Sequence, residues 1–201
     1  DVICLDKTGT ITANRMTLRD VRWMPGAEGY GPWLGAFAVA SAGESKTAEA
    51  LAAGLAAHSN SARPVANVPF NSERRWSAAT LELGAEQRTF VLGAPETVLP
   101  LCEGGAELQA AYHEAAEQGL RGVVFAEAAS LPAPGVAMSG LRPLALLTLG
   151  DELRPEVRSA FAMMDELGIE PKLISGDNPE TVRSILAQLG ITLKGGIVSG
   201  A

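Results

Sequence analysis

Residues 1–12 read Asp1-Val2-Ile3-Cys4-Leu5-Asp6-Lys7-Thr8-Gly9-Thr10-Ile11-Thr12. The continuous apolar run at residues 2–5 is typical of a strand that is buried on both faces in a parallel sheet. A carboxylate, Asp6, follows this strand directly, and a turn rich in glycine and hydroxyl groups comes next. That layout suits an aspartate that attacks a phosphate. The stretch therefore predicts an α/β fold and a phosphoryl-transfer site.

Two further apolar runs predict strands of the same parallel sheet. Residues 144–149 form one, which ends at Gly150-Asp151, and residues 172–174 form the other, which ends at Ser175-Gly176-Asp177-Asn178. A helix is expected between them, and a second helix follows, with Pro179 in its first turn and Gly190 after its end. Residues 144–190 thus read strand–helix–strand–helix, as in a parallel α/β sheet.

Acidic or hydroxyl side chains follow each of the three expected strands. They lie at residues 6–10, at Asp151 and at residues 175–178. Because ligands bind at the carboxyl ends of the strands in open α/β sheets, we expect these three groups to converge on one site.

The middle of the chain predicts an α+β insert with an antiparallel sheet. Its expected helices span residues 45–58 and 108–118, its strands span residues 76–83, 89–92 and 122–128, and residues 130–140 read as a loop. We therefore expect one α/β domain, built from residues 1–14 and 141–201, to be interrupted by a second domain, residues 15–140.

Composition narrows the possible functions. The 201 residues are 47% hydrophobic, which suffices for a core, and their net charge of −7 argues against a nucleic-acid binder. The chain contains no run of 18 apolar residues, so no membrane span is expected in it. Because the chain opens five residues before Asp6 and without methionine, we expect it to be a piece of a longer protein.

Residues 6–12 resemble the phosphorylation signature of the P-type ATPases, ion pumps of the haloacid dehalogenase-like superfamily that form an aspartyl-phosphate. Residues 175–178 resemble the Thr-Gly-Asp-Asn loop of these pumps, with serine in place of threonine. The resemblance implies a partial Rossmann-like sheet of the haloacid-dehalogenase type. The catalytic residues that it implies are Asp6, Lys7, Thr8, Ser175, Gly176 and Asp177.

The residue two positions after the nucleophile bears on the fate of the phosphate. Hydrolytic members of the superfamily carry a second aspartate there, which acts as general acid and base, whereas this chain has Thr8. A threonine cannot take a proton from water near neutral pH, so we expect a long-lived aspartyl-phosphate, which a pump needs. Mg²⁺ prefers oxygen ligands, and we expect it to be held by Asp6 and the Thr8 carbonyl.

Further segments resemble the nucleotide-binding parts of the pumps. Residues 69–77 would place Phe70 against adenine and Arg75 beside it, because an aromatic face and a cation both suit a nucleotide. In residues 92–96, Gly93 permits close approach of a base, but Leu92 replaces the lysine of the family. Arg121 would reach the nucleotide. Asp151 and Arg154 resemble an Asp-x-x-Arg segment, which would lie near the ribose and phosphates, as would Thr8.

The leading interpretation is a cytoplasmic fragment of an ATP-driven membrane cation pump. Its expected partners are ATP with Mg²⁺, a cation carried by absent membrane segments, and the rest of the parent chain. The alternatives are a soluble haloacid-dehalogenase-like phosphatase with a large cap domain and a purely regulatory nucleotide-binding module. The family's Gly-Asp-Gly-x-Asn-Asp loop does not occur in these residues, so we expect the fragment to autophosphorylate poorly. These residues do not specify which ion the pump carries, and the sequence mildly favours calcium or another light cation.

Overall fold

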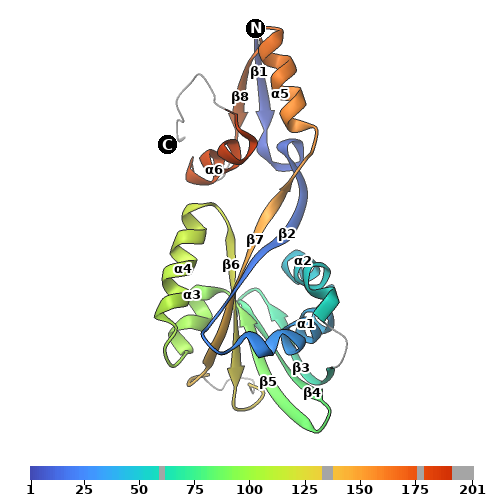
Figure 1. Ribbon diagram of the computed structural model, residues 1–201, viewed down its shortest axis with the longest axis vertical. Helices are drawn as coiled ribbons and strands as arrows, with labels where there is room; N and C mark the ends of the chain where they lie inside the picture. Colours follow the sequence, from blue (N-terminus) through green and yellow to red (C-terminus); the bar gives the residue numbers. More distant parts are fainter. Residues whose placement is uncertain (59–61, 133–137, 176–178, 192–201) are drawn as a thin grey trace.

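The molecule is elongated and has two lobes, which the long strands β2 (Thr12–Trp23) and β7 (Arg142–Leu153) connect (Figure 1). This computed structural model describes residues 1–58, 62–132, 138–175 and 179–191. The N-terminus lies at the far end of the smaller lobe. Among the helices that the structure describes, none combines the length and hydrophobicity that a membrane span requires.

The larger lobe is built on a six-stranded antiparallel sheet in the order β2-β7-β6-β5-β4-β3. Its other strands are β3 (Arg63–Asn71), β4 (Trp76–Leu83), β5 (Glu86–Gly93) and β6 (Arg121–Ala128). Helices α1 (Gly31–Ala40) and α2 (Lys46–Leu55) pack on one face. Helices α3 (Pro95–Val98) and α4 (Ala106–Glu117) pack on the other. The expectation of an antiparallel α+β insert is confirmed.

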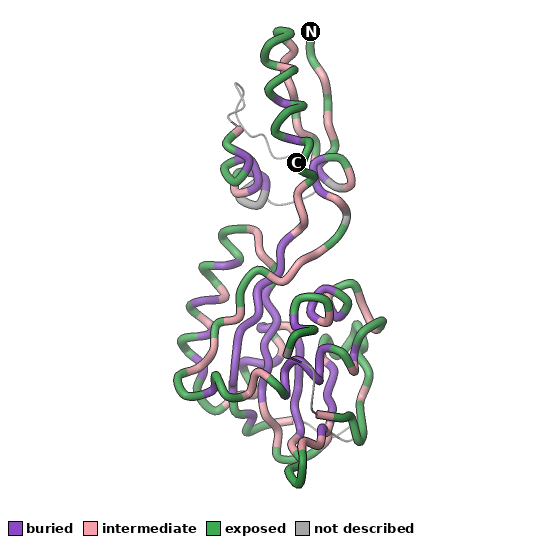
Figure 2. Tube along the Cα trace, turned by 45° about the vertical axis from the view of Figure 1, so that its right-hand side comes forward, coloured by how far each residue is buried: buried purple, intermediate pink, exposed green. Residues whose placement is uncertain are grey.

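Alternation along the central strands fills both faces of this sheet. Phe90 and Phe125 point toward α1 and stack with their ring centroids 4.9 Å apart, whereas their neighbours Val91 and Val124 point toward α4. Figure 2 shows the buried residues concentrated along these strands. The sheet of the larger lobe therefore has a hydrophobic core on each face.

The smaller lobe contains a parallel pair, β1 (Val2–Asp6) and β8 (Glu170–Ile174), with α5 (Val157–Glu166) and α6 (Pro179–Leu189). The parallel pairing predicted from residues 2–5 and 172–174 is confirmed. The expected burial of residues 2–5 on both faces is wrong, because this sheet has only two strands among the described residues and leaves Val2 and Cys4 exposed. Asp6 lies opposite Ile174, so Asp6 and Ser175 leave the same edge of the pair. The apolar centre of this lobe includes Ile11, Phe161 and Ile185.

The prediction for residues 144–149 is wrong in one respect. They form a strand, β7, but it pairs antiparallel with β2 and β6 in the larger lobe and does not join β1 and β8. The residues are buried on both sides because the antiparallel sheet carries helices on both faces, and this gives the same unbroken apolar pattern as a parallel strand. The parallel sheet therefore has two of the three expected strands, although Asp151 near the end of β7 still meets the loop after Asp6 through Lys7.

Candidate functional site

A cavity of about 680 Å³ opens in the larger lobe between segments that are far apart in sequence. Its walls come from residues 44–48 at the start of α2, from Phe70 and Arg75, from residues 92–94 and Glu96, from α4, and from the start of β6. Phe70, Arg75, Gly93 and Arg121, all predicted to contact a nucleotide, line this one space. Phe70 keeps 41% of its surface exposed, so its ring is available to a ligand.

Hydrogen bonds within the β3–β4 turn hold Arg75 at the cavity wall. Arg75 has a φ of 57°, which is uncommon for a residue other than glycine. Its amide donates to the Asn71 carbonyl oxygen at 2.7 Å, and its own carbonyl oxygen accepts from the Ala94 amide at 3.0 Å. The Arg75 guanidinium meets Glu96 at 2.9 Å. The turn is thereby tied to the segment after β5.

Gly93 fits where no larger residue can. A Cβ atom at this position would lie 2.6 Å from the Trp76 Cβ and 2.8 Å from the Arg75 carbonyl oxygen. We therefore expect Gly93→Ala to lower the free energy of unfolding by about 1–3 kcal/mol, as overpacking does, and to weaken ligand binding at the cavity. Urea unfolding would measure the change. Gly29→Ala is the matched control, since its Cβ would meet nothing within 4 Å, and an equal loss in both variants would contradict the account.

Sequence reasoning missed the part of the cavity at the start of α2. Ser45 caps this helix by accepting a hydrogen bond from the Ala48 amide at 3.1 Å, and Lys46 and Thr47 lie on the wall. The carboxylate of Glu44 accepts from the Phe70 amide at 2.9 Å. The N-cap serine before an alanine-rich helix was visible in the sequence, and a helix N-terminus attracts anions. That signal could have pointed to this wall.

Tyr112 and Leu92 also line the cavity, although no sequence motif predicts that either contacts the nucleotide. Burial, and secondly the charge of Glu96, raise the pKa of Tyr112 above its usual value. Leu92, for which the motif resemblance implies a lysine, is buried at the wall. Arg121, whose guanidinium lies 3.3 Å from the Thr47 hydroxyl, supplies a cation on the side of β6.

The loop that follows Asp6 forms a second cluster in the smaller lobe. Asp6 is exposed at the end of β1, and the chain then makes a π-helical turn, η1 (Lys7–Ile11). The Lys7 side chain is 5% exposed, and its ammonium lies 2.8 Å from the carboxylate of Asp151, which is 34% exposed. The Asp151 backbone is also held, because Arg19 donates to its carbonyl oxygen at 2.8 Å.

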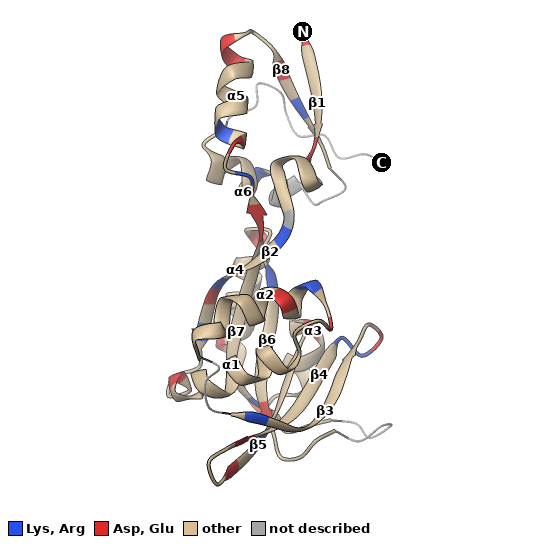
Figure 3. Cartoon of the chain, turned by 90° about the vertical axis from the view of Figure 1, so that its right-hand side faces the viewer, with Lys and Arg blue, Asp and Glu red and all other residues tan. Residues whose placement is uncertain are grey.

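Arg154 also forms hydrogen bonds to the loop that follows Asp6. Its Nε and Nη2 atoms donate to the Gly9 carbonyl oxygen at 3.2 and 3.0 Å, and its amide donates to the Ile11 carbonyl oxygen at 3.0 Å. Figure 3 shows basic and acidic residues gathered where β2 and β7 enter the smaller lobe. Neither Asp151 nor Arg154 is among the described residues that line the cavity.

The remaining predicted site residues are described in part. Ser175 directly follows β8 and is partly exposed, whereas Gly176 and Asp177 lie outside the described residues, as does the side chain of Thr8. No group of three or more histidine, cysteine or acidic residues in the described ranges could hold a metal ion alone. Mg²⁺ commonly takes one or two carboxylates and completes its shell with phosphate oxygens and water, so an exposed Asp6 fits as one ligand.

Comparison with protein families gives an independent measure of relationship. A family model described as haloacid dehalogenase-like hydrolase matches residues 1–200. The "Probable cation-transporting ATPase exp7" of Streptococcus pneumoniae is 36% identical over 200 residues, which cover 94% of this chain and 24% of that protein. The "Calcium-transporting ATPase CtpE" of Mycobacterium bovis is 32% identical over 195 residues, covering 95% and 24%. The chain thus spans about a quarter of the length of these relatives.

A solved structure supports the fold. The crystal structure of a zinc-transporting PIB-type ATPase superposes with a TM-score of 0.67 at 17% identity, over 96% of this chain and 28% of that one. Together with the relatives, it confirms the resemblance to the P-type ATPases that the sequence motifs predict.

Proposed function

The chain belongs to the haloacid dehalogenase-like hydrolases, and we propose that it is the ATP-binding and phosphoryl-accepting part of a P-type pump that moves a cation across a membrane. The observation that carries this proposal is the cavity in the larger lobe. Its volume of about 680 Å³ is within the usual range for small-molecule sites, and it gathers segments predicted separately to contact a nucleotide.

The cavity offers suitable partners for the adenine and the phosphates of ATP. The exposed Phe70 ring would stack on the adenine. Arg75, Arg121 and Lys46 lie on its walls with the N-terminus of α2, and these positive groups suit the phosphates. Leu92 adds apolar surface instead of the family's lysine, so the cations on the other walls would supply the polar contacts.

Asp6 would act as the nucleophile. One carboxylate oxygen attacks the γ-phosphorus, the bond from that phosphorus to the β–γ bridging oxygen breaks, and ADP leaves with the electron pair. Mg²⁺, when bound by Asp6, the Thr8 carbonyl and phosphate oxygens, would neutralise charge on the transferred group. With a threonine at position 8, the loop has no second aspartate to activate water, so the aspartyl-phosphate would persist. Ser175, Gly176 and Asp177 would contact the phosphoryl group.

Phosphoryl transfer requires the two lobes to cooperate. The described residues that line the cavity do not include Asp6, which lies in the smaller lobe. The γ-phosphate would therefore reach Asp6 when the lobes approach each other about β2 and β7. We further propose that the smaller lobe works as the phosphorylation domain and the larger lobe as the nucleotide-binding domain. Strand β7, which was expected in the first domain with residues 141–201, then belongs to the second. Membrane segments of the longer protein would carry the cation, and the described lobes would lie on the cytoplasmic side.

Phe70→Ala is expected to weaken ATP binding about 5- to 150-fold, since stacking of a base on an aromatic ring contributes about 1–3 kcal/mol. Isothermal titration calorimetry of the 201-residue chain would measure the dissociation constant. Val65→Ala is the matched control, because Val65 is an exposed apolar residue on the same strand and is not among the described residues that line the cavity. Equal dissociation constants for both variants would move the nucleotide site elsewhere.

A further inference from the structure

We infer that Asp151 and Arg154 are positioning residues, which hold the loop of residues 6–11 in shape for phosphoryl transfer and are not ligands of the nucleotide. The inference rests on the proposed role of Asp6 as nucleophile. It assigns to these two residues a different part in the reaction from the ribose and phosphate contacts that their sequence motif implies.

The contact of Asp151 fixes the residue next to the nucleophile. The Lys7 ammonium is almost entirely removed from solvent and lies 2.8 Å from the Asp151 carboxylate. A charge-assisted hydrogen bond of this length is strong and directional. Since Arg19 of β2 donates to the backbone carbonyl oxygen of Asp151, the backbone that carries this carboxylate is anchored to β2. Lys7 therefore has a fixed acceptor, which restricts the backbone on the C-terminal side of Asp6.

Arg154 fixes the middle and the end of the loop. Two guanidinium donors share the Gly9 carbonyl oxygen, and the Arg154 amide bonds the carbonyl oxygen of Ile11. Inside the loop, the Thr12 amide donates to the Lys7 carbonyl oxygen, and the Gly9 amide donates to the Thr12 hydroxyl at 3.3 Å. The loop thus has its own hydrogen bonds and is held from outside at three of its residues.

The same contacts leave few groups for a nucleotide. Arg154 uses Nε and Nη2 on Gly9, and Asp151 uses Oδ2 on Lys7. Strand β7, which contains Asp151 and ends one residue before Arg154, does lie beside the cavity, because its Leu149 pairs with Arg121 of β6. Residues 149–154 therefore connect the wall of the cavity to the nucleophile loop, and a shift of this strand on ligand binding would be passed to Asp6.

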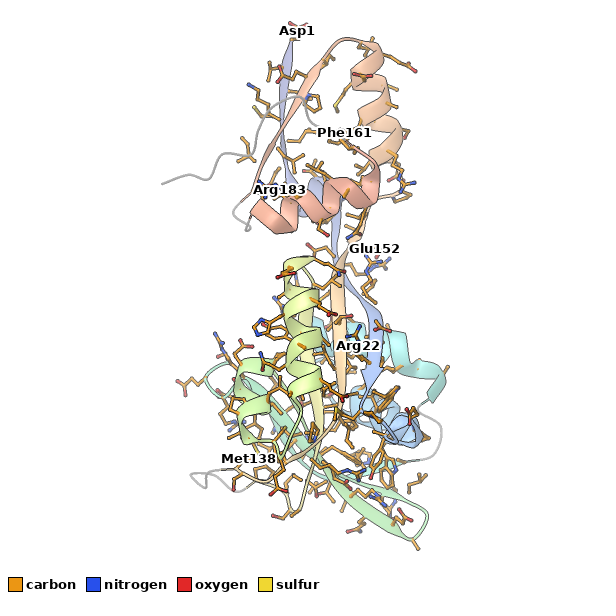
Figure 4. All side chains as sticks on the ribbon, turned by 60° about the vertical axis from the view of Figure 1, so that its left-hand side comes forward. Asp1, Arg22, Met138, Glu152, Phe161 and Arg183 are labelled. Carbon is orange, nitrogen blue, oxygen red and sulfur yellow. The ribbon has the colours of Figure 1, made fainter. Side chains whose placement is uncertain are left out.

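Hydrogen exchange of the loop amides tests the inference on the 201-residue chain. The variants are Asp151→Asn, which keeps an oxygen acceptor but loses the charge, and Arg154→Lys, which keeps the charge but loses the planar fork. We expect the amides of Gly9 and Thr12 to exchange about 10- to 100-fold faster in both, because hydrogen bonds to charged groups are lost. Glu152→Gln is the matched control. Glu152, labelled on β7 in Figure 4, pairs with Arg15 of β2, and no hydrogen bond or ion pair joins it to the described side chains of the loop.

Nucleotide affinity separates a positioning residue from a ligand. In both variants, the ATP dissociation constant of the 201-residue chain should stay within about twofold of the unsubstituted value, since neither residue lines the described cavity. A tenfold or greater rise in that constant, or loop exchange no faster than in Glu152→Gln, would overturn the inference. If the unsubstituted chain bound no ATP, the proposed function would fail, whereas the exchange measurement would still decide whether Asp151 and Arg154 hold the loop.

Discussion

Asp6→Asn in the full-length pump proposed above is expected to abolish phosphate incorporation from ATP. The amide oxygen is a far weaker nucleophile than a carboxylate, so the rate should fall by roughly four orders of magnitude or more, as it does when a nucleophile is removed from other enzymes. Incorporation of radioactive phosphate from γ-labelled ATP, followed by acid quenching, would measure the effect. An acyl phosphate is stable in acid and labile to hydroxylamine, which distinguishes it from a phosphoserine.

Asp20→Asn is the control for this experiment. Asp20 is exposed on β2 and lies outside both the described cavity wall and the loop contacts, so its variant should label normally. Hydroxylamine-labile phosphate of undiminished amount in Asp6→Asn would show that another residue is the nucleophile. ATP binding by the larger lobe should be the same in both variants, because Asp6 lies in the other lobe.

Removing Asp151 from the Lys7–Asp151 ion pair is expected to lower the free energy of unfolding more than removing Lys7 does. Asp151→Leu removes a charged hydrogen bond from the deeply buried Lys7 ammonium, and we expect the free energy of unfolding to fall by about 2 kcal/mol. Lys7→Met instead leaves Asp151, which can be hydrated, and should cost about 1 kcal/mol or less. Urea unfolding followed by NMR signals of the smaller lobe would give both values.

The double variant provides the control. With Lys7→Met and Asp151→Leu together, no buried charge is left from this pair, and much of the stability lost in Asp151→Leu should return. Equal losses in the two single variants would contradict this account, because the order follows from the exposed fractions of the two side chains.

The elements with strong periodicity or clear caps could be predicted from sequence. Helices α2, α4, α5 and α6 and strands β1, β4, β5, β6 and β8 all lie close to the ranges expected for them. Their signals are local: a proline in the first turn and a glycine after the end, as at Pro179 and Gly190, or a short run of apolar and β-branched residues.

Other elements could not be predicted, because their patterns follow from tertiary position. Strand β2 carries Arg15, Arg19 and Arg22 because it lies at the edge of the sheet, where charged side chains reach solvent. Helix α1 shows no polar face, since residues 33–38 are all buried between α2 and the sheet. Strand β7 was expected in the parallel sheet because an apolar run does not specify its neighbours.

The residues of the candidate site also divide into those that a local motif predicts and those that only the fold brings together. Phe70, Arg75, Gly93 and Arg121 could be predicted because they lie in short motifs, and the fold brings them to one cavity. Glu44 and Lys46 were missed because their place at the cavity depends on a tertiary contact, in which the turn before α2 meets β3 through the hydrogen bond from the Phe70 amide to Glu44. The contacts of Asp151 and Arg154 with residues 7–11 join segments more than 140 residues apart, which no local pattern indicates.

The most direct test of the nucleotide site is an NMR titration of the ¹⁵N-labelled 201-residue chain with ATP and Mg²⁺. The account predicts that the largest amide shift changes fall on residues 44–48, on Phe70 and Arg75, on residues 92–94, and on Arg121, with none of similar size on the far hairpin between β4 and β5. Changes confined to other surfaces, or no change at millimolar ATP, would contradict the claim that this cavity binds the nucleotide.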